Sequence, residues 1–146
     1  MRVADLMSSM RTVLNAIALG DYGQDSGATS LTEAAFLSAE EPGQMQPHGL
    51  YVLEPVAVVP SQRQLRGGLM SAAVNVSLTS RLRPTVSQGP LDLMAAWGMA
   101  ERVAEVLMRD VTDATLAVER VEYLGTSPDS GTCAHLIQIT ATYEGA

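Results

Sequence analysis

Residues 89–111, GPLDLMAAWGMAERVAEVLMRDV, are the one long stretch of this sequence whose apolar residues keep a helical period. These residues recur at steps of three and four and therefore share one face of an α-helix. They are Leu93, Trp97, Ala100, Ala104, Leu107 and Val111. The opposite face is polar and includes Glu101 and Arg109. Because strand-like segments precede and follow this helix, we expect its apolar face to cover a sheet.

The composition is that of one globular domain spanning residues 1–146. Apolar residues make up 47% of the chain, and no run of about 18 uncharged apolar residues is present that could cross a bilayer. Sixteen acidic and nine basic side chains give a net charge of −7, which disfavours a large contact with nucleic-acid phosphates. The single cysteine, Cys133, excludes an internal disulfide and any multi-cysteine metal site. We therefore expect neither a membrane nor a nucleic-acid duplex as the binding partner.

The N-terminal unit, residues 1–20, is predicted to contain a helix over residues 2–19. Its apolar residues repeat at helical spacing, and they are Val3, Leu6, Met10, Val13 and Ile17. Gly20 stands where a residue in the left-handed conformation ends many helices. The sequence therefore predicts a second amphipathic helix that ends beside Gly20.

Residues 21–49 are predicted to form an extended loop, because turn-forming glycine, proline, serine and aspartate residues recur along them. Inside this loop, Ser30 and Glu33 have the spacing of a capping box, which predicts a short helix through about Ala39. A connection of this length is unusual inside a compact domain. We therefore expect residues 21–49 to be an interaction loop or an arm.

Two strands joined by a hairpin are predicted over residues 50–82. Residues 50–59 are rich in apolar and β-branched residues, but Pro55 has no N–H to donate, so this strand should lie at a sheet edge or contain a bulge. Residues 72–82 alternate apolar and polar side chains, as a strand with one buried face does. A Gly-Gly pair at residues 67–68 can supply the positive φ of a tight turn. We expect the tip of this hairpin to project beyond the domain.

A second strand pair is predicted over residues 115–143. Apolar side chains fall on both faces of residues 115–124, which indicates a strand that is covered on both sides. Residues 133–143 place His135, Ile137, Ile139 and Ala141 on a common face. The elements then follow the order α-β-β-α-β-β. This order predicts an α+β domain with a four-stranded mixed or antiparallel sheet and with helices packed on one of its faces.

Few residues have the types and spacings of a catalytic or metal-binding site. His48 and His135 are the only histidines, and neither has further ligands or a base at a motif spacing. We expect His48 to be an exposed loop residue and His135 to be a strand side chain with a satisfied hydrogen-bond partner. Cys133 shares a strand face with His135, but the sequence supplies no acid or helix terminus to activate a thiolate there. We predict no catalytic, cofactor-binding or metal-binding residue, and therefore no enzyme.

Nearly half of the positive charge is concentrated around the predicted hairpin and the strand that leaves it. The residues are Arg63, Arg66, Arg81 and Arg83. Two interpretations are open: a solvated charged face, or a complementary contact with an acidic neighbour. Under the second interpretation these four arginines are the candidate interface residues of the chain.

The pattern of elements resembles the tail terminator, or tail completion, proteins of long-tailed bacteriophages and related gene-transfer particles. The matching features are the helix over residues 2–19, residues 56–60 leading into a polar hairpin, the alternating strand around residues 74–78, the helix with Trp97, and the closing strand at residues 137–143. The likeness covers nearly the whole chain and lies in the order and size of the elements.

The resemblance implies a structural protein of the virion tail and neck, assembled in the host cytoplasm. It implies a homohexameric ring that caps the last ring of tail-tube subunits, stops polymerisation of the tube and presents a surface to the head-completion proteins. No cofactor is implied, and DNA is expected only as the genome passing through the channel. In such a ring each subunit uses two different patches in a contact that closes on itself. We expect the hairpin with Arg63 and Arg66 and the loop at residues 21–49 to lie at these contacts.

Two other functions remain open. One is another neck component, a head-to-tail adaptor or stopper protein, which would be found as a dodecamer or bound to the portal. The other is a cytosolic ligand-binding α+β module or a small enzyme. That protein would be a monomer or dimer with a deep pocket lined by Cys133 and His135.

Overall fold

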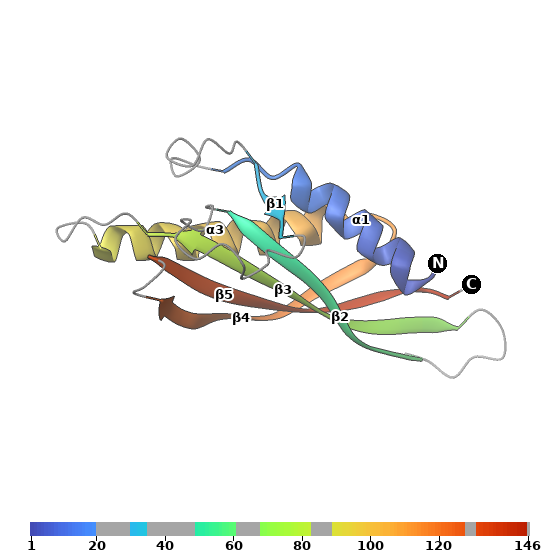
Figure 1. The fold of residues 1–146 in the computed structure, drawn as a ribbon. Coiled ribbons are helices and arrows are strands. Elements are labelled where there is room, and N and C mark those ends of the chain that lie inside the picture. Colours follow the sequence, from blue (N-terminus) through green and yellow to red (C-terminus); the bar gives the residue numbers. More distant parts are fainter. Residues whose placement is uncertain (20–29, 35–48, 61–67, 83–88, 128–130, 146) are drawn as a thin grey trace.

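A computed structural model describes residues 1–19, 30–34, 49–60, 68–82, 89–127 and 131–145 of the chain. In chain order its elements are α1 (Val3–Asn15), β1 (Thr32–Glu33), β2 (Leu50–Pro60), β3 (Leu69–Arg81), α3 (Gly89–Asp110), β4 (Thr115–Ser127) and β5 (Thr132–Glu144) (Figure 1). The helices pack against a long, twisted sheet, so the fold is α+β, as the sequence predicts.

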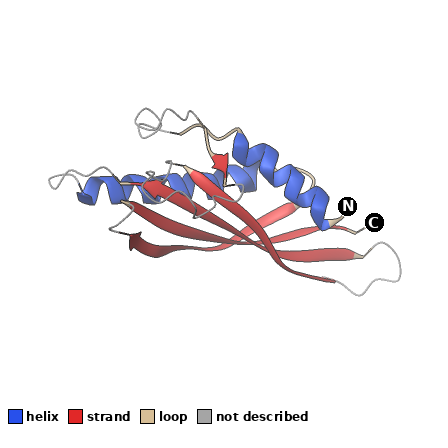
Figure 2. Cartoon of the chain, in the orientation of Figure 1, coloured by secondary structure: helices blue, strands red, loops and turns tan. Residues whose placement is uncertain are grey.

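The strands form one sheet in the order β1-β2-β3-β5-β4. The pairs β2–β3, β3–β5 and β5–β4 are antiparallel, and β1 runs parallel to β2, so the sheet is mixed. Both α1 and α3 lie on one face of this sheet (Figure 2), and among the described residues no helix covers the other face. The prediction of four strands is wrong by one, because β1 spans two residues and leaves no periodic pattern in the sequence.

The hydrophobic core lies between the two helices and the covered face of the sheet. On α3, the predicted apolar stripe is buried at Ala100, Ala104 and Leu107, and it continues to Val111 just beyond the helix. Alternate residues of β3 and β5 reach the same core: Val74, Val76, Leu78, Ile137, Ile139 and Ala141. The helix over residues 89–111 and the alternation of β3 and β5 are therefore confirmed.

The first helix is shorter than the sequence predicts. α1 ends at Asn15, where the N–H groups of Ala16 and Ile17 bond carbonyl oxygens three residues back and tighten the last turn. Ile17 is then buried, and its carbonyl oxygen accepts the N–H of Leu31 at 3.0 Å. The chain leaves the helix to contact the returning segment, so the predicted end beside Gly20 is wrong; Gly20 itself lies outside the described residues.

The short helix predicted from Ser30 is wrong at its start, because Thr32 and Glu33 form β1 beside Leu50 and Tyr51 of β2. The Glu33 carboxylate, which a capping box would aim at its own helix, instead accepts the Arg11 Nε–H of α1 at 3.0 Å. The remainder of that prediction, through Ala39, lies outside the described residues.

Tyr51 ties α1 to the sheet. Its side chain is fully buried, and its hydroxyl donates a hydrogen bond to the Asn15 side-chain oxygen at 2.7 Å. Burial, with a further contribution from the nearby Glu33 carboxylate, raises the pKa of Tyr51 to about 12. The phenol therefore stays neutral and holds the C-terminal end of α1 against β2 across the physiological pH range.

Replacing Tyr51 with phenylalanine is expected to lower the free energy of unfolding by about 0.5–1.5 kcal/mol, because the ring keeps its packing and only the hydrogen bond to Asn15 is lost. Equilibrium urea unfolding measures the change. Adding Asn15→Ala to the Tyr51→Phe variant should then cost less than Asn15→Ala costs in the wild type. Equal unfolding midpoints for the wild type and Tyr51→Phe would contradict a stabilising role for this bond.

β2 is an edge strand over most of its length. It pairs with β3 on one side, and its other side pairs with β1 only at Leu50 and Tyr51 within the described residues. Its register with β3 shifts between Pro55 and Ala57. Both alternatives predicted for a strand with a proline at position 55, an edge and a bulge, are therefore realised.

β4 is covered on one side, contrary to the prediction. Leu116 is its only buried residue, and the strand has register shifts between Val118 and Arg120 and between Tyr123 and Gly125. The first shift inserts one extra residue, so Leu116 and Val121 face the same side of the sheet although their spacing is odd. Apolar residues at both even and odd positions of β4 thus reflect a bulge in the strand and not burial of both of its faces.

Candidate functional site

Three rings meet where α3 contacts β4 and β5. The ring centroid of His135 lies 4.6 Å from that of Trp97, edge to face, and 5.5 Å from that of Tyr123. His135 is fully buried, and in the part of the chain that the structure describes neither of its ring nitrogens has a hydrogen-bond partner. The prediction of a satisfied partner is wrong, because strand alternation places His135 in the core beside aromatic rings.

Cys133 and His135 lie two residues apart on the covered face of β5, and both are buried. Burial raises the pKa of the Cys133 thiol and lowers the pKa of the His135 imidazole. Both shifts favour the neutral forms, whereas a nucleophilic pair needs a thiolate beside an imidazolium. Both side chains therefore lie in surroundings that favour their neutral forms.

The candidate interface arginines divide between described and undescribed parts of the chain. Arg63, Arg66 and Arg83 lie outside the described residues, as does His48. Arg81 is the last residue of the 13-residue strand β3. It therefore stands at the end of β3 that is farthest from the β2–β3 hairpin.

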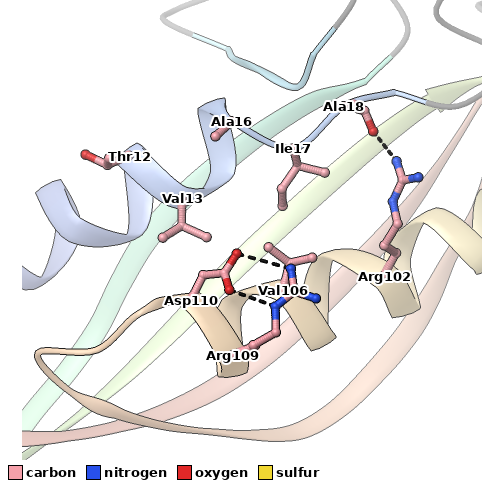
Figure 3. Close-up of a pocket in the computed structure, with 9 residues that line it drawn as sticks. All are labelled: Thr12, Val13, Ala16, Ile17, Ala18, Arg102, Val106, Arg109 and Asp110. Atoms are coloured by element: carbon pink, nitrogen blue, oxygen red, sulfur yellow. Dashed lines mark hydrogen bonds and ion pairs between the residues drawn. The ribbon is translucent and has the colours of Figure 1, made fainter.

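α1 and α3 leave a groove of about 460 Å³ between them, shown in Figure 3. It is lined by Thr12, Val13, Ala16, Ile17, Ala18, Arg102, Val106, Arg109 and Asp110. Arg102 donates to the carbonyl oxygen of Ala18, and the Arg109 Nε–H donates to Asp110 at 2.7 Å. The charged side chains at this groove thus already have partners within the chain.

At one end of the sheet, the second half of β2 is an edge strand that pairs with the first residues of β3, and these residues of β3 pair on their other side with the end of β5 (Figure 1). Every residue of β2 from position 54 to position 60 is exposed. Three large apolar side chains stand out on it: Val56 is 58% exposed, Val58 40% and Val59 53%. We call these three residues the valine arm. Val58 aligns with Ala72 and Val59 with Ser71, so these neighbouring valines face opposite sides of the sheet. The tip of the predicted hairpin, residues 61–67, lies outside the described residues. The exposure of the valines was not predicted, although a run of valines in a strand with a proline was a usable signal.

A second exposed apolar surface lies at the other end of the sheet. Met94 of α3 is 58% exposed, Leu124 of β4 52% and Tyr123 37%. Trp97 is half-buried; it follows Met94 by one helical turn, and its ring lies 6.4 Å from that of Tyr123. We call these four residues the aromatic end.

The register separates the two surfaces along the strands. Tyr123 aligns through His135 with Leu78, whereas Val59 aligns with Ser71. The intervening residues of β3 correspond to roughly 20–25 Å at a rise of about 3.3 Å per residue. Figure 1 likewise places the arm and the N-terminal half of α3 at opposite ends of the molecule.

Within the described ranges, no group of three or more histidine, cysteine, aspartate or glutamate side chains is placed to hold a metal ion. None of the described helices is long and apolar enough to cross a bilayer. The features that stand out are therefore the valine arm, the aromatic end and the groove between the helices. A comparison with protein-family models and with curated proteins finds no match to this chain.

Proposed function

We propose that this chain is a structural protein of a phage tail and neck. In this proposal it forms a homohexameric ring that caps the tail tube, stops its polymerisation and joins it to the head-completion proteins. The observation that supports the proposal best is the valine arm, three exposed valines on the outer half of the edge strand β2.

The arm is the kind of surface that a subunit of an assembly needs. The exposed valines of this edge strand gain free energy when another surface covers them. An exposed apolar surface on a protein of this size marks a contact site more often than a catalytic one. These properties favour a protein that works by docking onto other subunits.

The charge of the chain agrees with a ring through which a genome passes. With sixteen acidic and nine basic side chains, the subunit has a net charge of −7 that repels phosphate groups, so DNA passing it is not held in place. The neutral, buried Cys133 and His135 pair agrees with a part that has no chemical step.

Two measurements test the proposal: the mass of the native assembly, and the length of the tail tubes that polymerise in its presence. Native mass spectrometry of the purified protein should give a six-subunit ring, and adding that ring to polymerising tail-tube protein should stop growth of the tubes. A dodecamer that binds portal and not tube would favour the head-to-tail adaptor or stopper. A monomer or dimer that binds a small molecule in the groove between α1 and α3 would favour the ligand-binding module.

A further inference from the structure

We propose that the first half of α3 is an acid-sensitive latch, which opens away from the sheet when His135 gains a proton. The latch consists of residues 93–97, which precede Gly98 and hold Trp97 against the ring of His135. The second half of α3 stays packed on the core. The inference does not depend on the proposed function, because it concerns one subunit by itself.

His135 is buried at a point where a positive charge has no counterpart. Neither of its ring nitrogens has a hydrogen-bond partner. The groups around it come from four elements: Trp97 of α3, Tyr123 of β4, Cys133 two residues away on β5, and Leu78 opposite it on β3. None of them is an anion, since burial keeps the Cys133 thiol neutral. An imidazolium here would be a buried ion without a counter-ion, and cation–π contacts with the two aromatic rings offset only part of that cost.

The described carboxylates on these elements do not compensate such a charge. Glu122 of β4 lies on the opposite face of the sheet, where its carboxylate pairs with Arg120 at 3.3 Å. Glu101 of α3 is exposed, one helical turn beyond the latch. The side chain of Asp92, in the first turn of α3, lies outside the described part of the chain. Neither Glu122 nor Glu101 bonds the ring of His135.

The latch is the part of this contact that can move. β5 pairs with β3 along one edge and with β4 along the other, so the sheet holds His135 in place. Within the latch only Ala96 is buried, whereas Met94 and Ala95 are exposed. The rest of α3 is anchored by a row of buried residues: Met99, Ala100, Val103, Ala104 and Leu107. Lifting the latch therefore uncovers little of the core, as local opening requires.

Gly98 separates the latch from the anchored half of α3. Apart from proline, glycine is the least favourable residue inside a helix. Nothing lies within 4 Å of the point that a Cβ at position 98 would occupy, so packing does not require a glycine there. The helix is thus weakest directly after Trp97. Opening at this point would add Trp97 and the inner face of the sheet at Leu78 to the exposed apolar surface of the aromatic end.

The direction of the pH effect follows from the burial of His135. In the open state the imidazole is in water and has its ordinary pKa of 6.5, whereas burial lowers its pKa in the closed state. Between these two pKa values the open state binds a proton that the closed state does not. The ratio of open to closed molecules therefore rises as the pH falls, by up to about tenfold between about pH 7.5 and about pH 5.5.

Labelling of Cys133 measures the opening. It is the only cysteine, it is 1% exposed, and it lies beside His135 on the covered face of β5. The reagent 4,4′-dithiodipyridine reacts with thiols at acid as well as at neutral pH. Dividing the labelling rate by that of the urea-unfolded chain at the same pH removes the pH dependence of the thiol itself. For the wild type we expect this normalised rate to rise about three- to tenfold from about pH 7.5 to about pH 5.5.

Three variants test the parts of the latch. His135→Phe should be labelled at the same normalised rate at both pH values, because it has no imidazole to protonate. Gly98→Ala should be labelled about three- to fivefold more slowly than the wild type at each pH, because alanine strengthens the helix. Met108→Ala is the matched control in the anchored half of α3, where Met108 is 45% exposed, and it should be labelled like the wild type. Far-UV circular dichroism verifies that each variant is folded.

Sub-denaturing urea distinguishes opening of the latch from global unfolding, because the urea dependence of the labelling rate scales with the surface exposed. We expect a slope less than about half of the slope of equilibrium unfolding. A slope equal to that of equilibrium unfolding would overturn the inference, since Cys133 would then be reached only in the unfolded chain. An equal rise with falling pH in His135→Phe would overturn it too, as would labelling of Gly98→Ala as fast as the wild type.

Discussion

Replacing Leu107 with alanine is expected to lower the free energy of unfolding by about 2–5 kcal/mol. Leu107 is fully buried in the core between α3 and the sheet. The loss combines the transfer free energy of the deleted methyl groups with the cavity that they leave. Urea unfolding followed by the fluorescence of Trp97, the only tryptophan, measures it.

Met108→Ala is the matched control for this prediction. Met108 is the next residue of the same helix, but it is 45% exposed, so its truncation should change the free energy of unfolding by about 0.5 kcal/mol or less. If Leu107→Ala and Met108→Ala had equal effects, the orientation of α3 on the sheet would be wrong.

The protein should become less stable when the pH falls from about 7.5 to about 5.5, because of His135. Burial lowers the pKa of this imidazole below its ordinary value of 6.5. Between the folded and unfolded pKa values, the unfolded chain binds a proton that the folded chain does not, so stability decreases as the pH decreases through this window. Each unit of lowering corresponds to about 1.4 kcal/mol.

Replacing His135 with phenylalanine should flatten this pH dependence. The variant keeps a ring beside Trp97 and removes two buried nitrogens that have no partner among the described residues, so we expect it to be more stable by about 1–3 kcal/mol at neutral pH. Thermal unfolding at several pH values measures both effects. Asp110→Asn is the control: the hydrogen bond from Arg109 lowers the pKa of Asp110 below 3.8, so this carboxyl does not titrate in the same window. Equal pH slopes for the wild type and the phenylalanine variant would contradict the assignment to His135.

The parts of the fold that the sequence predicted are those with a long, regular period. The apolar stripe of α3 and the alternation in β3 each extend over several turns or pleats, so their buried faces follow directly from the order of the residues. β1 was missed because two residues carry no period, and the capping-box pattern at Ser30 and Glu33 outweighed a pairing with β2 that is formed in three dimensions. The bulge in β4 was missed because a one-residue insertion looks like a second buried face.

The candidate site was predicted less completely, because it depends on contacts between distant elements. The position of His135 on the inner face of its strand followed from alternation, but its lack of a hydrogen-bond partner depends on which rings of α3 and β4 surround it. Arginines were predicted as interface residues because a cluster of charge can be recognised from the order of the residues alone. The exposure of Val56 and Val59 depends on which part of the sheet the helices cover, and no local pattern of residues contains that information.

The prolines of β2 have a consequence for the behaviour of this protein in a crowded cell. A long apolar edge strand is a template on which further chains can add without limit, as they do in amyloid fibrils. Pro55 and Pro60 interrupt that template at two points, one at the start and one at the end of the exposed half of the strand. The protein can therefore keep valines accessible while resisting fibril growth, and we expect Pro55→Val with Pro60→Val to bind thioflavin T on incubation where the wild type does not.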